Sequence, residues 1–302
     1  MANNLVEVVP NGGWDERIII CRHGALVDTT IIVTERWVVL VDTLVNLATA
    51  QALIEIAKPF LDRRALLVVN THADWDHAWG NHAFAGPQAL HPAPIIARQL
   101  CAERLRTSES EMLATMRERQ PGRFDDVVLT PPTLLFDQTL RIDGGDLTLE
   151  LFATPGHQPD HLSIYIPEIR TLLAGDAAEL PFPFPRSAAD LPILRQSLAR
   201  MAAYEPAVAL YCHAPGVASP SVIGHNRTYF DRLEQACRQA LANGVPANPT
   251  EDADLEALIN FTYQQAVADI GAGLDAEELA GFYRPGHLAS IRKMLEWVAS
   301  SE

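Results

Sequence analysis

A polar segment that directly follows a short apolar run is the feature that most restricts what this chain can fold into. Residues 65–69 are apolar without interruption, which is typical of a buried strand. Residues 70–77 then read Asn-Thr-His-Ala-Asp-Trp-Asp-His. Crowding two imidazoles and two carboxylates is unfavourable unless a cation neutralises the carboxylates, and a divalent metal does so while using the imidazole lone pairs. The candidate ligands of this loop are His72, Asp74, Asp76 and His77.

The spacing within this loop indicates more than one metal. His72, Asp74 and Asp76 alternate along the chain, so they would share one side of an extended segment. His77 follows directly and would face elsewhere. One loop could therefore serve two adjacent ions.

Three more candidate ligands each stand just past a strand-like segment. Polar residues at the ends of packed strands suit a site assembled at one edge of a sheet. They are His157 after residues 147–153, Asp176 after residues 171–173 and His213 after residues 208–211. Together the candidates are too many for a single ion with roughly four to six ligands, so the sequence predicts two divalent transition-metal ions.

The rest of the chain alternates strand-like and helical patterns. Strands are predicted at residues 17–21, 28–33 and 37–41, and helices at 46–61, 95–118 and 190–203. From about residue 220 the pattern is helical, and the apolar stripe of a C-terminal helix comprises Leu288, Ile291, Leu295 and Val298. Gly244-Val245-Pro246 is the one candidate boundary. It divides a predicted catalytic domain, residues 1–245, from a helical extension, residues 246–302, packed on the same domain.

The order of these motifs resembles that of the metallo-β-lactamase-fold hydrolases. Their signature is HxHxDH after a strand, a His in a PGH turn, an Asp in a GD turn and a late His after a strand. This chain has the same elements in the same order over residues 16 to about 215: His72-x-Asp74-x-Asp76-His77, Pro155-Gly156-His157, Gly175-Asp176 and His213. The resemblance implies an α/β (α+β) fold, a four-layer αββα sandwich with the metals at one edge of the two sheets and with extra C-terminal helices here.

The resemblance also implies a role for each candidate. His72, Asp74 and His157 would hold one metal, and Asp76, His77 and His213 the other. Asp176 would bridge them, and Asp76 would also orient the nucleophile. The family's second His is Asp74 here. A carboxylate hardens the first site, so iron or manganese becomes as plausible as zinc.

The function implied is that of a dinuclear metal-dependent hydrolase, in which a metal-bridging water attacks the substrate. The substrate would be a small ester, thioester, lactone, amide, phosphoester or sulfoester. His161, four residues after His157, could contact this substrate or pack at the head of the next strand.

Two alternatives remain open. The related flavodiiron proteins carry a carboxylate, Glu, at the position of Asp74, so a di-iron oxidoreductase is one of them. The 89 residues after His213 contain no phosphate-cradling Gly-rich loop (302 − 213 = 89), so its electron donor would be external. A non-catalytic metal-binding protein on the same scaffold is the other.

Composition restricts the partners. The chain has 23 Lys and Arg against 38 Asp and Glu, a net charge of −15, which disfavours nucleic acids and anionic membrane surfaces. The four cysteines are dispersed and the first residues lack a secretory pattern, so we expect a cytoplasmic protein. The expected partner is a small-molecule substrate, and the sequence leaves the oligomeric state open.

Overall fold

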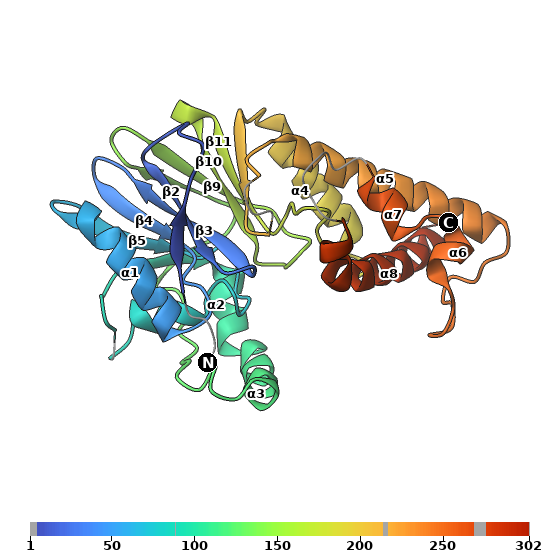
Figure 1. Ribbon diagram of the computed structural model, residues 1–302, viewed down its shortest axis with the longest axis horizontal. Coiled ribbons are helices and arrows are strands. Elements are labelled where there is room, and N and C mark those ends of the chain that lie inside the picture. The colour runs from blue at the N-terminus through green and yellow to red at the C-terminus, as the bar shows by residue number, and fades with distance from the viewer. Residues whose placement is uncertain (1–4, 88, 214–216, 269–275, 302) are drawn as a thin grey trace.

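Seven strands form one sheet of the computed structural model and five form a second, and the two sheets pack face to face (Figure 1). The structure describes residues 5–87, 89–213, 217–268 and 276–301. The first sheet contains, in order, β1 (Glu7–Val9), β2 (Ile18–His23), β3 (Val27–Val33), β4 (Trp37–Val41), β5 (Ala65–Val69), β6 (Ile95–Arg98) and β7 (Leu134–Phe136). The second contains β12 (Val208–Tyr211), β11 (Thr171–Gly175), β10 (Leu162–Ile166), β9 (Thr148–Ala153) and β8 (Thr139–Asp143).

Both faces of the first sheet are buried, which explains its continuous apolar runs. In β4, Val39 and Val41 pack into the core between the sheets, whereas Val38 and Leu40 pack on the outer side. From β4 to β7 the neighbouring strands are parallel, so the carboxyl ends of β4 and β5 lie at the same edge. This edge receives the polar segment predicted to bind metal.

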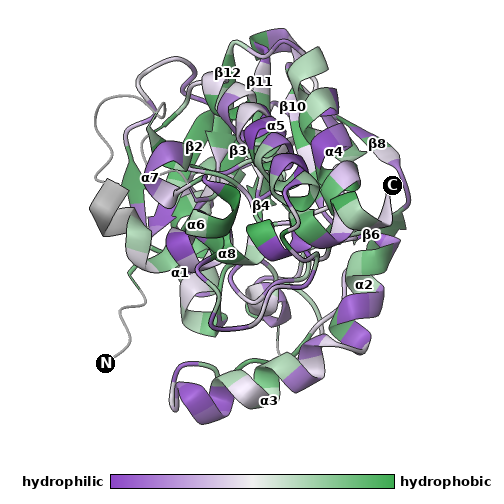
Figure 2. Cartoon of the chain, turned by 90° about the vertical axis from the view of Figure 1, so that its right-hand side faces the viewer, coloured by the Kyte–Doolittle hydropathy of each residue, from purple (hydrophilic) through white to green (hydrophobic). Residues whose placement is uncertain are grey.

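Helices cover the outer face of each sheet and complete four layers, which confirms the αββα sandwich. On the first sheet, α1 (Leu47–Leu61) begins at Asn46, whose side chain caps the helix in a capping box with Thr49. The second sheet is covered by α4 (Leu191–Ala203), α5 (Ser221–Ala242) and α8 (Ala276–Ser300), with the short α6 (Leu255–Ile259) and α7 (Tyr263–Val267) beside them. Figure 2 looks onto this helical end, with the sheets behind it. Among the described helices, none is both long and apolar enough to cross a bilayer.

Two local predictions are wrong. Residues 95–118 are not one helix, because Ile95 and Ile96 pair with β5 and β7 as strand β6. The helices α2 (Gln99–Arg106) and α3 (Glu109–Arg119) follow separately. The metal-binding segment is also not extended throughout: the amides of His77 and Ala78 both donate to the carbonyl of Asp74, which folds the loop into a turn.

The other predicted strands and helices are found within a few residues of their expected bounds. In α8, Ile291, Leu295 and Val298 are fully buried, as the apolar stripe predicts. The helices after residue 245 share one core with α4 and α5, and the boundary there stays a prediction. Residues 214–216, after His213, and 269–275, within the predicted extension, lie outside the described residues.

Candidate metal centre

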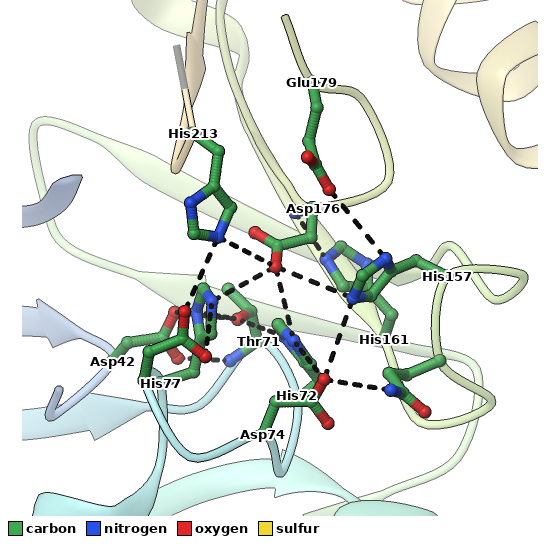
Figure 3. A network of polar contacts seen from close by, with 12 residues as sticks. Asp42, Thr71, His72, Asp74, His77, His157, His161, Asp176, Glu179 and His213 are labelled. Carbon is green, nitrogen blue, oxygen red and sulfur yellow. Dashed lines mark hydrogen bonds and ion pairs between the residues drawn. The ribbon is translucent and has the colours of Figure 1, made fainter. Parts of the chain in front are cut away.

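The candidate ligands come together where four strands end at one edge of the sandwich (Figure 3). β5 leads into the loop of residues 70–77, while β9, β11 and β12 lead to His157, Asp176 and His213. Two backbone hydrogen bonds join the sheets here. The amide of Leu162 donates to the carbonyl of Thr71 and that of Asp28 to Cys212, both at 2.9 Å. These hydrogen bonds hold the two sheets together beside the candidate ligands.

Asp176 lies at the centre of four imidazoles. Its Oδ2 is 3.2 Å from Nε2 of His77, 3.3 Å from that of His213, 3.5 Å from that of His72 and 3.7 Å from that of His157. All four rings thus turn the same nitrogen toward one carboxylate oxygen, which is the arrangement expected of a shared ligand (Figure 3).

The other two carboxylates divide the imidazoles into two groups. Oδ2 of Asp74 is 3.6 Å from Nε2 of His72 and 3.7 Å from that of His157, and we call these three residues the first group. Asp76 reaches His77 at 3.8 Å and His213 at 3.7 Å, and these three form the second group. Each group offers three ligand atoms within 4.8 Å of one another, close enough to hold an ion. The turn after Asp74 is what directs Asp76 and His77 to the second group.

Groups of the sheet edge hold the second group from behind. Nδ1 of His77 donates to Oδ2 of Asp42 at 2.8 Å, and Nδ1 of His213 donates to the carbonyl of Leu26 at 2.8 Å. A neutral ring that donates from Nδ1 keeps its lone pair on Nε2, which faces the centre. Asp42 has a φ of 64°, a left-handed conformation that is uncommon for a non-glycine residue, and it also accepts both hydrogen bonds that Thr71 donates, each 2.7 Å.

The imidazoles of the first group have different supports. Because the hydroxyl of Thr71 donates to Asp42, it can accept from Nδ1 of His72, 3.0 Å away. Nδ1 of His157 lies 3.9 Å from Oε1 of Glu179 and has no hydrogen-bond partner among the described residues. Glu179 is buried, and its other oxygen accepts from the hydroxyl of Tyr283 in α8 at 3.1 Å.

Asp74 is held from two directions. Its Oδ1 accepts from Nη2 of Arg104 at 2.6 Å, and its Oδ2 accepts from the side-chain amide of Gln158 at 2.9 Å. Arg104 belongs to α2. The carboxylate of Asp74 therefore has hydrogen-bond partners of its own.

The pKa shifts describe a site in which protons and metal ions compete. Burial alone would raise the pKa of Asp74 and Asp176, but the neighbouring cationic groups outweigh it and hold both pKa values well below the usual range. Burial likewise opposes a charged imidazole, but the carboxylates raise the pKa of His157 to about 9 and that of His213 to about 10. A bound cation would replace these protons.

Buried polar atoms without hydrogen-bond partners also indicate metal binding. Nε2 of His72, Nε2 of His77 and Oδ1 of Asp176 are buried and have no hydrogen-bond partner within the described part of the chain. Buried polar atoms are normally paired, and the two Nε2 atoms point to the centre between the groups. The residues present therefore fit two metal ions.

His161 lies behind Asp176. Its Nε2 accepts the backbone amide of Asp176 at 3.0 Å, so its Nδ1 carries the proton and donates to the hydroxyl of Thr154 at 2.8 Å. The ring is fully buried, and a Cβ on Gly175 would lie 2.5 Å from Nε2. The substrate contact expected of His161 stays a prediction, and the geometry favours a role in positioning Asp176.

The structure also assigns partners to residues that the sequence analysis passed over. Arg104, Asp160 and Glu179 all contact candidate ligands or their loops. Their partners lie between 22 and 87 residues away in the sequence (179 − 157 = 22; 160 − 73 = 87). No local spacing in the sequence connects such pairs.

Comparison with known proteins agrees with this geometry. A family model described as the metallo-beta-lactamase superfamily matches residues 24–213. No curated protein is similar enough in sequence to count as a match.

Solved structures share the fold. A "metallo-beta-lactamase from Pontibacter korlensis" has a TM-score of 0.56 and 21% identity, covering 75% of this chain and 99% of that one. A metallo-beta-lactamase family protein from Thermus thermophilus has a TM-score of 0.61 and 18% identity, covering 98% and 93%. The "stereoselective inverting sec-alkylsulfatase Pisa1 from Pseudomonas sp." has a TM-score of 0.61 and 17% identity, covering 97% of this chain and 50% of that chain.

Proposed function

Because the chain belongs to the metallo-β-lactamase superfamily, we propose that it is a hydrolase that depends on two divalent transition-metal ions. The observation that carries this proposal is the position of Asp176, whose Oδ2 lies between 3.2 and 3.7 Å from four imidazole nitrogens. A carboxylate surrounded in this way is suited to bridge two cations.

Each group would hold one ion. The first ion would be bound by His72, Asp74 and His157, and the second by Asp76, His77 and His213, with Asp176 between them. When bound, the ions lower the pKa of a water ligand and polarise the substrate oxygen. Zinc is the first choice, and the hard oxygen of Asp74 favours iron or manganese more than an imidazole would.

The chain's own residues would orient the reacting groups. Asp76 is mostly buried beside the second group, and its carboxylate would accept a proton from the attacking nucleophile and direct it at the substrate. Asp42 and the carbonyl of Leu26 keep His77 and His213 in the tautomer that presents Nε2. We propose that these contacts make the site rigid before substrate binds.

The proposed substrate is a small ester, thioester, lactone, amide, phosphoester or sulfoester, met in the cytoplasm. The Pisa1 structure, described as a sec-alkylsulfatase, makes secondary alkyl sulfates a useful member of a test panel. At 17% identity it supports the shared fold alone, so the other classes stay on the panel.

The test combines metal analysis with that panel. Protein prepared without chelators and remetallated is expected to carry two transition-metal ions per chain by elemental analysis. It should hydrolyse at least one substrate class, and a chelator should abolish that turnover. One ion or fewer per chain would contradict the dinuclear proposal.

A second candidate is a di-iron oxidoreductase, which the carboxylate of Asp74 favours. Iron at both positions, together with reduction of a small oxidant by an external electron donor and no hydrolysis, would replace the first proposal with this one. Two bound ions without either activity would indicate a non-catalytic metal-binding protein.

A further inference from the structure

Asp74 has two oxygens that could bind a metal, whereas an imidazole at this position would present one nitrogen. A ligand imidazole offers one nitrogen, whereas a carboxylate has two oxygens and can rotate between binding modes. Here the two oxygens have different surroundings. Oδ2 lies near His72 and His157 and accepts from the side-chain amide of Gln158 at 2.9 Å, whereas Oδ1 accepts from Arg104 at 2.6 Å.

Arg104 is itself fixed by two more carboxylates. Its Nη1 donates to Oδ1 of Asp160 at 2.7 Å, and its Nη2 donates to Oε1 of Glu109 at 2.8 Å. Asp160 is fully buried, and its other oxygen accepts the backbone amide of Ala73 at 2.8 Å.

The guanidinium therefore connects two ligand loops. Asp74 belongs to the loop after β5, and Asp160 to the turn after β9 that carries His157. The Ala73–Asp160 hydrogen bond runs parallel to this connection and joins the same two loops. Both loops contribute to the first group, whereas no hydrogen bond or ion pair joins Arg104 to the second group among the described residues.

We propose that Arg104 is a positioning residue of the first metal site. By occupying Oδ1 of Asp74 it leaves Oδ2 as the oxygen that faces the metal, and by binding Asp160 it sets the distance between the two loops. This inference rests on the proposed metal-binding function and adds the residue that makes a carboxylate usable at this position.

The chemistry of the side chain agrees with this role. Arginine has a planar fork of donors that can serve several carboxylates at fixed angles, whereas lysine is a compact charge on a flexible stem. Burial lowers the pKa of the guanidinium, but Asp160, Asp74 and Glu109 outweigh it and raise that pKa above the usual range, so Arg104 keeps its charge.

The test measures metal affinity, which does not require a known substrate. The variants are R104M and R104K, with R106M on the exposed side of the same helix as the matched control. Each is also made together with D74H. The metal-free proteins are titrated with Co²⁺ against a chromophoric chelator, which gives the number of ions, their affinities and the absorption bands of each site.

We expect R104M to weaken binding of the first ion by roughly 10- to 100-fold, the usual effect of losing a residue that supports a metal ligand. The second ion and the R106M protein should be unchanged. In the D74H background R104M should have a clearly smaller effect on the first ion, because an imidazole has no second oxygen to be held and only the contact of Arg104 with Asp160 is lost.

R104K keeps a positive charge among the three carboxylates, so it remains informative if R104M does not fold. A folded R104K with weakened first-ion binding supports positioning by the fork, and binding like that of the wild type overturns the proposal. An equal loss with and without D74H also overturns it, because Arg104 would then act on the fold in general. A wild-type chain that binds fewer than two ions would instead contradict the proposed function.

Discussion

The two halves of the candidate metal centre are supported by different parts of the molecule. The second group rests on the sheet edge: Asp42 directly follows β4, and Leu26 directly precedes β3. The first group rests on helices and their neighbouring loops, with Arg104 in α2 and Glu179 tied to Tyr283 in α8.

The difference teaches where such a site can vary. Strands that hydrogen-bond to neighbours on both sides leave little freedom at their ends, so the supports of the second group are fixed by the fold itself. A helix can place a new side chain near the site without changing a strand register. The departure from the family motif, Asp74, accordingly lies in the half whose supports come from helices.

The largest expected effect is that of a substitution that weakens both halves of the centre. Asp176→Ala should lower the affinity for both ions by more than the roughly 10- to 100-fold caused by losing a supporting residue, because two cations would then face each other without a shared anion. Elemental analysis after dialysis measures it. His161→Ala, which removes only the partner of the Asp176 amide, should cost less; the reverse order would contradict the bridging role.

A smaller change should affect one half alone. Glu179→Gln should weaken binding of the first ion by about 10-fold, because it removes the negative charge that lies 3.9 Å from Nδ1 of His157. Tyr283→Phe should also weaken binding of the first ion, by less than Glu179→Gln does. Competition with a chelator separates the two affinities, and a loss confined to the second ion would break the proposed division of supports.

Metal preference tests the departure at Asp74. Asp74→His should raise zinc occupancy several-fold relative to manganese and iron, because it replaces a hard oxygen by an imidazole nitrogen. Both proteins are remetallated from equal mixtures of the three ions and analysed. Unchanged ratios would mean that Asp74 is not a ligand. The test needs a check that the variant still folds, since Arg104 loses one of its three carboxylate partners.

The smallest expected effect concerns Glu109, and it is a change in folding stability. Burial raises the pKa of Glu109 to about 7, so the folded state binds a proton at Glu109 more tightly than the unfolded state does. The stabilisation of the folded state by this proton is complete below the unfolded pKa near 4.5 and is lost as the pH rises through about 7. Glu109→Gln should therefore be more stable than the wild type at pH 8, by about 1 kcal/mol after allowing for the lost partner of Arg104, and similar to it at pH 5. Denaturant melts at the two pH values measure this, and an equal difference at both would contradict it.

Much of the fold was predictable from the sequence because its signals are local. The run before His72 and the alternation of Leu147, Leu149 and Leu151 specify buried strands, and polar residues after them specify the edge where strands end. Strand β6 was not predictable in this way. Its few residues have no period of their own, and only pairing with β5 and β7 makes them a strand.

The candidate ligands were also predictable from local sequence signals. The residues that hydrogen-bond to these ligands or lie against them were not. Each ligand stands in a short motif, whereas Arg104 acquires its role only when α2 brings it to two loops, 30 residues from Asp74 and 56 from Asp160. Glu179 and Tyr283 are 104 residues apart. A charged residue on a helix is ordinarily solvated, so the pattern alone favours an exposed face.

The contact between α8 and Glu179 has a consequence for the order of events during synthesis. A chain leaves the ribosome from its N-terminus, and domains assemble as their parts emerge. Asp42, Leu26 and the whole second group precede residue 214, so every part of that half is synthesised before α8. Glu179, behind His157, receives the hydrogen bond of Tyr283 only after α8 has docked. If the chain binds metal as proposed, the docking of the last helix would complete the support of the first group.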